Sequence, residues 1–257
     1  MAIVTYASDG TVGRITISRP ERRNALNHTA VEELHEAVRR AAADEVRCLV
    51  VTGSHGHFCA GADLMELEDL AFTVALRAAL DDLAALAFPT IAAIAGSCMG
   101  LGSQIALACD LRVATPDARF AVPVAKLGLM VDHWTVQRLF LLAGPSTARW
   151  MMLTAEPVSA NHAADVGLVQ RLIEPDTDDA GAAVLEEADR LAAHIATLAP
   201  LSLAGSKLGL DLLERAAAEV DPDGAYRAAF ERAWASDDLV EGQRAFAERR
   251  PPEFRGH

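Results

Sequence analysis

Apolar residues in the first half of the chain follow two different spacings. Apolar and polar residues alternate over Gly13–Ser18, just before Pro20, which predicts a strand with one buried face. A continuous apolar run over Cys48–Thr52, stopped by Gly53, predicts a strand buried on both faces. Further segments are strand-like over Thr90–Ala95 and Leu111–Ala114, and helical over Thr29–Ala43, Phe72–Ala87 and Gly102–Cys109. Strands and helices recurring in this order predict crossover connections and an α/β core.

From about Thr135 onward the pattern changes, and predicted helical segments follow one another. They are expected over Val136–Leu142, Thr147–Leu153, Ala160–Val166, Ala182–Ala196, Leu201–Ala217, Ala225–Ala235 and Leu239–Arg249. The segment Glu174–Gly181, rich in aspartate, is expected to be a short surface loop. A helical region without a sheet of its own needs cover for its apolar faces, and a partner subunit is a reasonable cover.

Composition restricts the class of protein. The chain has 257 residues, of which 51% are apolar and 23% charged, so it is long enough for one large domain with a substantial core. The net charge of −13 argues against a broad nucleic-acid surface, but a pocket with a few local cations could still hold an anion. The start of the chain lacks a secretory pattern, and no apolar run approaches the ~20 residues of a membrane span. We expect a cytoplasmic protein without a transmembrane segment.

The cysteines and histidines do not form a metal-binding pattern. Cys48, Cys59, Cys98 and Cys109 lie in apolar segments without tight pairing, which is typical of reduced, buried thiols. His55 and His57 flank Gly56 and are too sparse a set for a metal. We expect neither a metal nor a resident cofactor.

Three segments are candidates for chemistry. Arg19–Asn27 is a basic turn after a strand, and charge alone favours a solvated loop there. Phe58–Asp63 is a run of small residues that either lets a ligand approach the backbone or packs tightly against a neighbour. Ala95–Gln104 leads through glycines into a helix, whose first N–H groups could hold a phosphate or a developing oxyanion. It lacks the GxxxxGK[ST] spacing of a nucleotide-binding loop.

Taken in this order, these segments resemble the crotonase superfamily, the enoyl-CoA hydratase/isomerase family. The resemblance runs from about Val12 to Phe254 and is carried by ITISRPERRNALN, FCAGADL, AAIAGSCMGLGSQIALACDLRVAT, ARFAVPVAKLGL, QRL and AFAERRPPEF. It implies an α/β fold, the crotonase (ClpP-like) spiral of ββα turns. It also implies an acyl-CoA-binding core over residues 1–196, a helical trimerisation region over 197–257, and a homotrimer or a dimer of trimers.

The resemblance also assigns site residues. The backbone N–H groups of Ala62 and Leu101 would bind the thioester oxygen of an acyl-coenzyme A, where losing one donor typically costs about 3–4 kcal/mol in the transition state. Leu101 replaces a glycine often found at its position. Coenzyme A enters only as part of this ligand. Residues expected to contact it are Arg22, Arg23, Ala25, Leu26, Ala60, Asp63, Phe246 and Arg249, the last two from an adjacent subunit.

The chain departs from the family where hydratases carry two catalytic glutamates. Gln104 and Val124 stand at those positions, and neither can transfer a proton. General acid and base catalysis typically contribute about 10²–10⁴-fold each, so hydration should be very slow. The replaced glutamates and the segments GLMVDHWTVQRL and RPPEFRG resemble a mycobacterial-type subgroup that retains acyl-CoA binding in fatty-acid or mycolic-acid precursor metabolism.

Asp132 leaves an enzymatic alternative open. Dienoyl-CoA isomerases of this family carry a catalytic aspartate at the matching position, which would make the protein an enoyl- or dienoyl-CoA isomerase. Asp is also a favoured helix N-cap, and a helical run begins just after Asp132 and His133. The sequence thus predicts an acyl-CoA-binding protein with little hydratase activity. Its alternatives are an isomerase that uses Asp132, or a structural subunit with an obstructed pocket.

Overall fold

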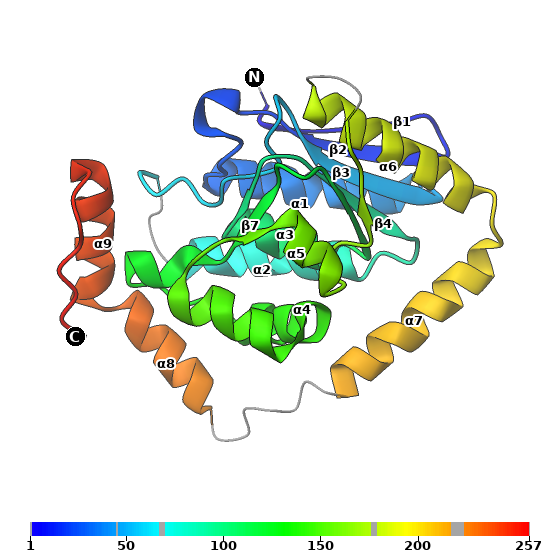
Figure 1. Cartoon of the computed structure of the whole chain (residues 1–257). Coiled ribbons are helices and arrows are strands. Elements are labelled where there is room, and N and C mark those ends of the chain that lie inside the picture. Colours follow the sequence, from blue (N-terminus) through cyan, green and yellow to red (C-terminus); the bar gives the residue numbers. More distant parts are fainter. Residues whose placement is uncertain (1, 45, 67–69, 176–178, 217–223, 257) are drawn as a thin grey trace.

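A mixed six-stranded sheet forms the centre of the computed structural model, which describes all residues except 1, 45, 67–69, 176–178, 217–223 and 257 (Figure 1). Its strands, in spatial order, are β1 (Val4–Ser8), β2 (Val12–Ile17), β3 (Cys48–Gly53), β4 (Thr90–Ile94), β6 (Leu111–Ala114) and β9 (Arg171–Leu172). Only the β1–β2 pair is antiparallel in this sheet. Parallel neighbours require crossover connections, as the alternation of strand and helix patterns predicts.

A second, three-stranded sheet follows the order β5 (Ser97–Met99), β7 (Arg119–Ala121) and β8 (Val158–Ser159). Two strands of the first sheet lead into it after a few residues: β4 continues into β5, and β6 into β7. β5 is followed by α3 (Leu101–Ala108), so β4, β5 and α3 form one ββα turn. This arrangement confirms the α/β architecture predicted for the chain.

Helices cover both faces of the six-stranded sheet. α6 (Ala180–Ala196) packs on one face, against Cys48 and Val50 of β3. Leu49 and Val51 point to the other face and join the main core, which includes α1 (His28–Ala43), α2 (Leu70–Ala84) and α3. Because successive strand residues point to opposite faces, a continuous apolar run is what a strand covered on both sides requires. The prediction for this strand is therefore confirmed.

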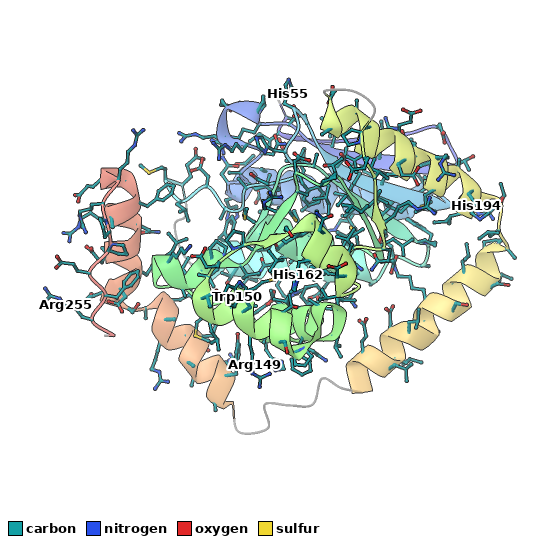
Figure 2. The ribbon with its side chains drawn as sticks, viewed as in Figure 1. His55, Arg149, Trp150, His162, His194 and Arg255 are labelled. Carbon is teal, nitrogen blue, oxygen red and sulfur yellow. The ribbon has the colours of Figure 1, made fainter. Side chains whose placement is uncertain are left out.

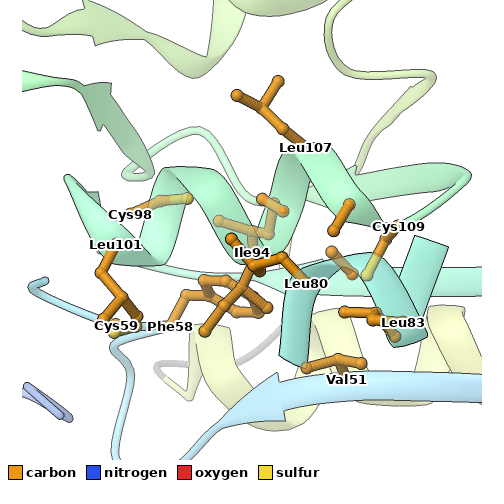
Figure 3. Close-up of a cluster of buried hydrophobic side chains, with 14 of the residues drawn as sticks. Val51, Phe58, Cys59, Leu80, Leu83, Ile94, Cys98, Leu101, Leu107 and Cys109 are labelled. Atoms are coloured by element: carbon orange, nitrogen blue, oxygen red, sulfur yellow. The ribbon is translucent and has the colours of Figure 1, made fainter. Parts of the chain in front are cut away.

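The helix α3 lies inside the main core. All eight of its residues are buried, and Leu101 at its first turn lies beside Cys59 and Phe58 (Figure 3). An almost uncharged helix can be buried on all sides because it exposes no charged face that would need water. The position of this first turn is thus fixed by apolar packing from several directions.

The C-terminal helices extend from the core and then return to it. α7 (Pro200–Ala216) runs along one side of the molecule, followed by α8 (Ala225–Trp234) and α9 (Asp237–Glu248) (Figure 1). The exposed leucines of α7 are Leu201, Leu208, Leu210, Leu212 and Leu213. α7 is anchored by buried Lys207, whose ammonium donates to Asp110 Oδ2 at 2.8 Å. α9 lies against the 3₁₀ turn Pro123–Leu127.

Sequence analysis did not predict every feature of the second half of the chain. The two helices predicted on either side of Gly144 form one kinked helix, α4 (His133–Thr154), in which Gly144 has φ 75° and Pro145 follows. The helical C-terminal region predicted after Thr135 is confirmed, and two two-residue strands that were not predicted, β8 and β9, lie between its first helices. Such short strands lack a repeating pattern of their own. α5 (Ala160–Asp165) was predicted. The loop predicted over 174–181 lies partly outside the described residues, and the division at residues 196 and 197 stays a prediction.

Gly102 offers a test of how closely the segments before α3 pack. A Cβ on Gly102 would lie 2.2 Å from the backbone oxygen of Cys59, so Gly102→Ala must push the two segments apart. We expect a loss of about 2–3 kcal/mol in the free energy of unfolding, measured by denaturant titration. The control is Gly205→Ala in α7, where nothing lies within 4 Å of the new Cβ. It should be neutral or stabilising by up to about 1 kcal/mol; equal effects of the two variants would contradict this packing.

Candidate functional site

Two loops that are far apart in the sequence are joined by main-chain hydrogen bonds. The N–H of Phe58 donates to Ala95 O at 2.9 Å, and the N–H of Cys59 to Ser97 O at 2.8 Å. In return, the N–H of Met99 donates to Cys59 O at 3.0 Å. These bonds continue the pairing of a parallel ladder beyond the strands. The small-residue turn and the glycine turn predicted from the sequence therefore form one rigid wall.

The backbone of Ala62 is placed by Leu26 on the opposite side. Leu26 donates its N–H to Gly61 O at 2.9 Å and accepts from the N–H of Asp63 at 2.8 Å. In this parallel bridge it is the neighbours of Ala62 that bond to Leu26, so the amide of Ala62 itself faces away. Gly61 makes the turn with φ 112°, a region that side chains rarely adopt. Within the described part of the chain, the Ala62 N–H donates to no protein acceptor.

The amide of Leu101 comes from the first turn of α3. Gly100, with φ 52°, precedes the helix, and its own N–H is occupied by Ala121 O at 2.8 Å. Leu101 is the first helical residue, so its N–H has no partner four residues back. The helix begins one residue earlier than predicted, which is what makes this amide one of its free donors. Leu101 N lies 3.9 Å from the point that a Cβ on Gly61 would occupy, so the two turns meet here.

Asn24 holds the basic turn beside this wall. Its side chain is fully buried, accepts from the N–H of Arg19 at 2.8 Å, and donates to Ser54 O and His57 O at 2.9 and 2.6 Å. Arg23 and Asn24 both adopt left-handed backbone conformations. This leaves Arg22 and Arg23 exposed on the outside of the turn.

A cavity of about 960 Å³ lies against these segments. The predicted positions that line it are Arg22, Arg23, Ala25, Ala60, Ala62, Asp63, Leu101, Gln104, Val124, Asp132 and Phe246. Much of the remaining wall is apolar and includes Phe72, Leu76, Leu80, Leu129, Phe230 and Trp234. Most of the candidate residues are therefore brought together at one large cavity that has a basic turn at one side.

Two of the predicted ligand residues lie elsewhere. Leu26 is fully buried and does not line the cavity, so its contribution is the pair of main-chain bonds that place Ala62. Arg249 is also absent from the described cavity wall. Phe246 of α9 lines the cavity of its own chain. The predicted contribution of Phe246 and Arg249 to an adjacent subunit stays a prediction. Asp63 is buried, with its carboxylate 3.0 Å from Arg19.

Hydrogen bonds link four polar residues at the cavity, Gln104, Thr135, Asp132 and Arg77, which we call the polar chain; all but the buried Thr135 line the cavity. Gln104 Nε2 donates to Thr135 Oγ1 at 3.0 Å, and that hydroxyl donates to Asp132 Oδ1 at 2.5 Å. Asp132 Oδ1 also caps α4 by accepting from the N–H of Thr135 at 3.0 Å. Arg77 Nη1 donates to Asp132 Oδ2 at 3.3 Å. Asp132 therefore caps the N-terminus of α4, as predicted, and also lines the cavity.

Aromatic residues lie at the end of this chain that is formed by Asp132 and Arg77. The guanidinium of Arg77 lies 3.9 Å from the ring centre of Trp134, a cation–π contact. Tyr226 of α8 donates its hydroxyl to Val131 O at 2.7 Å, next to Asp132. Burial and then the negative charge of Asp132 raise the pKa of Tyr226 to about 12, so the phenol stays protonated. Sequence reasoning missed Arg77 and Thr135, because a single Arg or Thr in a helical segment carries no motif.

The thiols and histidines are not arranged for metal or nucleophilic chemistry. The four cysteines are free and buried, and burial raises the pKa of Cys48, Cys59 and Cys109 to about 12. The labelled histidines lie in separate parts of the molecule (Figure 2). In the described ranges, no group of three or more His, Cys, Asp or Glu side chains could hold a metal ion. Over the same residues, no helix combines the length and the apolar character needed to cross a bilayer.

Known proteins share both the sequence and the fold. The enoyl-CoA hydratase/isomerase family matches residues 7–257. A probable enoyl-CoA hydratase, echA6, of Mycobacterium bovis (strain ATCC BAA-935 / AF2122/97) is 41% identical over 249 residues, covering 94% of this chain and 95% of the relative.

Solved structures share the fold of the chain. An enoyl-CoA hydratase from Mycobacterium avium subsp. paratuberculosis K-10 superimposes with a TM-score of 0.83 at 27% identity, over 99% of both chains. A methylmalonyl-CoA decarboxylase in complex with 2-nitronate-propionyl-CoA does so with a TM-score of 0.87 at 25% identity, over 99% of both chains. With its two sheets, its helical C-terminal region and this match along nearly its whole length, the chain belongs to the enoyl-CoA hydratase/isomerase family, the crotonase superfamily, and has mycobacterial relatives within it.

Proposed function

We propose that the protein binds acyl-coenzyme A thioesters and holds the thioester oxygen between the backbone N–H groups of Ala62 and Leu101. The observation that carries this proposal is that both amides border one cavity and lack a protein acceptor among the described residues. Their turns are fixed by main-chain bonds, so the donors do not need to reorganise when a carbonyl binds or gains negative charge. Leu101 in place of glycine changes the shape of the wall but not the donor.

The basic turn supports a coenzyme A ligand. Arg22 and Arg23 are exposed beside the cavity, and neither forms an ion pair with the described residues. The protein as a whole carries a net charge of −13, so two unneutralised cations at one point favour an anionic ligand there. Phosphates of coenzyme A carry such charges, and the apolar wall beyond the two amides suits an acyl chain.

The proposal includes little hydratase activity. Gln104 and Val124 line the cavity at the positions that we match to the two hydratase glutamates. Gln104 is engaged as a donor to Thr135, and Val124 offers no titratable group. This wall is consistent with a protein of fatty-acid metabolism that binds its ligand rather than hydrating it. Mycolic-acid precursors are one class of such ligands. The exposed leucines of α7 support the accompanying proposal of a homotrimer or a dimer of trimers.

An isomerase that uses Asp132 is the second candidate, because this carboxylate lines the same cavity. Its two oxygens are engaged, Oδ1 by Thr135 and Oδ2 by Arg77. To accept a proton from a substrate, Asp132 would have to give up at least one of these contacts. The geometry therefore favours its role as a fixed acceptor and helix cap.

Leu101→Pro tests the second amide directly. Proline is tolerated at the first position of a helix, and the substitution removes the N–H group that would bind the thioester oxygen. We expect the affinity for a saturated acyl-CoA to fall at least about fivefold in calorimetric titration, in line with the loss of about one hydrogen bond. Leu101→Ala, which keeps the donor and trims the side chain, is the control. Unchanged binding by the proline variant would overturn the assignment of this amide.

Restoring the two carboxylates tests the reason for slow hydration. The wild type should hydrate an enoyl-CoA barely above background, measured as loss of the conjugated thioester absorbance. The double variant Gln104→Glu, Val124→Glu should gain at least about 10²-fold, because general acid and base catalysis contribute about that much each. The single variants should gain far less. A wild type already as active as the double variant would show that other groups carry out hydration.

Asp132→Asn separates the two candidate functions. If the protein only binds its ligand, the variant retains acyl-CoA binding, and wild type and variant are equally inert with enoyl- and dienoyl-CoAs. Asn is also a good N-cap, so stability should fall by less than about 1 kcal/mol. Turnover by the wild type that disappears in the variant would instead establish Asp132 as a catalytic base.

A further inference from the structure

The side chain of His57 replaces a main-chain acceptor between the two loops that carry the free amides. Cys59 accepts from the N–H of Met99 at 3.0 Å. Because the bonds of a parallel ladder repeat every two residues, the N–H of Ser97 would next donate to the main-chain oxygen of His57. That oxygen accepts instead from the side chain of Asn24 at 2.6 Å. The N–H of Ser97 donates to Nδ1 of the His57 ring at 3.2 Å. One imidazole nitrogen therefore continues the pairing of the two loops.

The bond to Ser97 requires a neutral imidazole. A backbone N–H only donates, so Nδ1 of His57 must carry a lone pair and the ring proton must lie on Nε2. An imidazolium carries protons on both nitrogens and cannot accept. The ring also lies directly against the backbone of the glycine turn, Ala95–Gln104, since a Cβ on Gly96 would lie 2.6 Å from Nδ1. Protonation of His57 would therefore set two N–H groups against each other at a close contact.

The surroundings of His57 favour the neutral ring. Burial, and then the positive charge of Arg23 in the basic turn, lower the pKa of His57 below its ordinary value. Asp117, in the turn between β6 and β7, opposes this by raising the pKa. Burial and Arg23 outweigh Asp117, so the ring takes up a proton only below the ordinary pKa of about 6.5. The N–H of Ser97 therefore keeps its acceptor near pH 7 and loses it in acid.

We propose that His57 is a positioning residue whose neutral ring holds the glycine turn in place, so that the amides of Ala62 and Leu101 meet at one thioester oxygen. This inference rests on the proposed function, because it assigns that oxygen to the two amides. Ser97 lines the cavity, whereas His57 is not among the lining residues, so His57 acts through Ser97. Protonation of His57 removes the bond to Ser97 and loosens the turn that carries Leu101. Binding of the thioester group should therefore weaken in acid.

The test compares decanoyl-CoA with free coenzyme A by calorimetric titration of the full chain between about pH 5 and pH 8, a range that spans the titration of His57. Both ligands carry the same phosphates, so a direct attraction between protonated His57 and a phosphate cancels in the ratio of their affinities. This ratio reports the binding of the acyl thioester. In the wild type, the advantage of decanoyl-CoA over coenzyme A should fall about fivefold toward the acid end, the size of one net hydrogen bond.

Three variants assign this pH dependence. His57→Asn places an oxygen where Nδ1 lies and keeps an acceptor that does not titrate, so the ratio should stay near its neutral-pH value throughout. His57→Leu, of similar size but without an acceptor, should show the lowered ratio at every pH. His55→Asn is the matched control, because His55 is exposed at the edge of the molecule and contacts Ser54 Oγ instead of the glycine turn (Figure 2). It should retain the wild-type profile.

The stability of the free protein gives a second measurement that needs no ligand. Because the pKa of His57 is lowered in the folded protein, the unfolded chain binds more protons below about pH 6.5. The contribution of His57 to the free energy of unfolding is thus present above this pH and is lost as the pH falls through the lowered pKa. Denaturant titration should show this loss in the wild type and its absence in His57→Asn.

The outcomes separate this inference from the proposed function. A wild-type ratio that does not change with pH, or that falls equally in His57→Asn, would overturn the role of His57 while leaving acyl-CoA binding intact. Equal pH dependence of stability in wild type and His57→Asn would likewise contradict it. Failure of the wild type to bind decanoyl-CoA more tightly than coenzyme A would instead remove the proposed function, and this role with it.

Discussion

The site depends on the main-chain pairing of two loops. Cys59 exchanges hydrogen bonds with Ser97 and Met99, and Leu26 holds the other side of the turn that contains Ala62. These bonds place the amides of Ala62 and Leu101, which have no acceptor among the described residues, at one cavity without any contribution from a reactive side chain. Because the donors belong to the backbone, evolution can change the side chain at position 101 and keep the donor. It cannot enlarge Gly102, which lies against Cys59, without separating the loops.

The side chains around this backbone site have a different character from the donors. Val124, Phe230 and Trp234 belong to the apolar part of the cavity wall, and hydrogen bonds link the residues of the polar chain from Gln104 to Arg77. Side chains linked in this way are oriented by their hydrogen bonds, which suits recognition more than proton transfer. The charge distribution is also consistent with a site for recognising a ligand. The acidic protein presents Arg22 and Arg23 at the cavity, neither of them in an ion pair with a described residue, on a turn that the buried Asn24 side chain holds.

Much of the fold could be predicted from residue patterns. The continuous apolar run at Cys48–Thr52 and the helical spacing at Thr29–Ala43 have one physical interpretation each, and the structure confirms both. The glycines at positions 61 and 100 indicated sharp turns, and both have positive φ. The family resemblance then supplied the assignment of Ala62 and Leu101, which residue spacing alone could not give. The resemblance also named the candidate residues, most of which line one cavity in the structure.

The features that could not be predicted depend on tertiary contacts, which leave no pattern in the local sequence. Two-residue strands such as β8 and β9 are too short to show alternation. Leu26 holds the turn of Ala62 through two main-chain hydrogen bonds, and its buried side chain does not line the cavity. Thr135 and Arg77 gain their roles only because α2 and α4 bring them to Asp132.

The most direct measurement of the central claim is a crystal structure of the protein with a bound acyl-coenzyme A. The account predicts that the thioester oxygen lies within about 2.7–3.2 Å of both the Ala62 and the Leu101 nitrogen atoms. A thioester bound in the cavity with its oxygen beyond hydrogen-bond distance of both amides would contradict it.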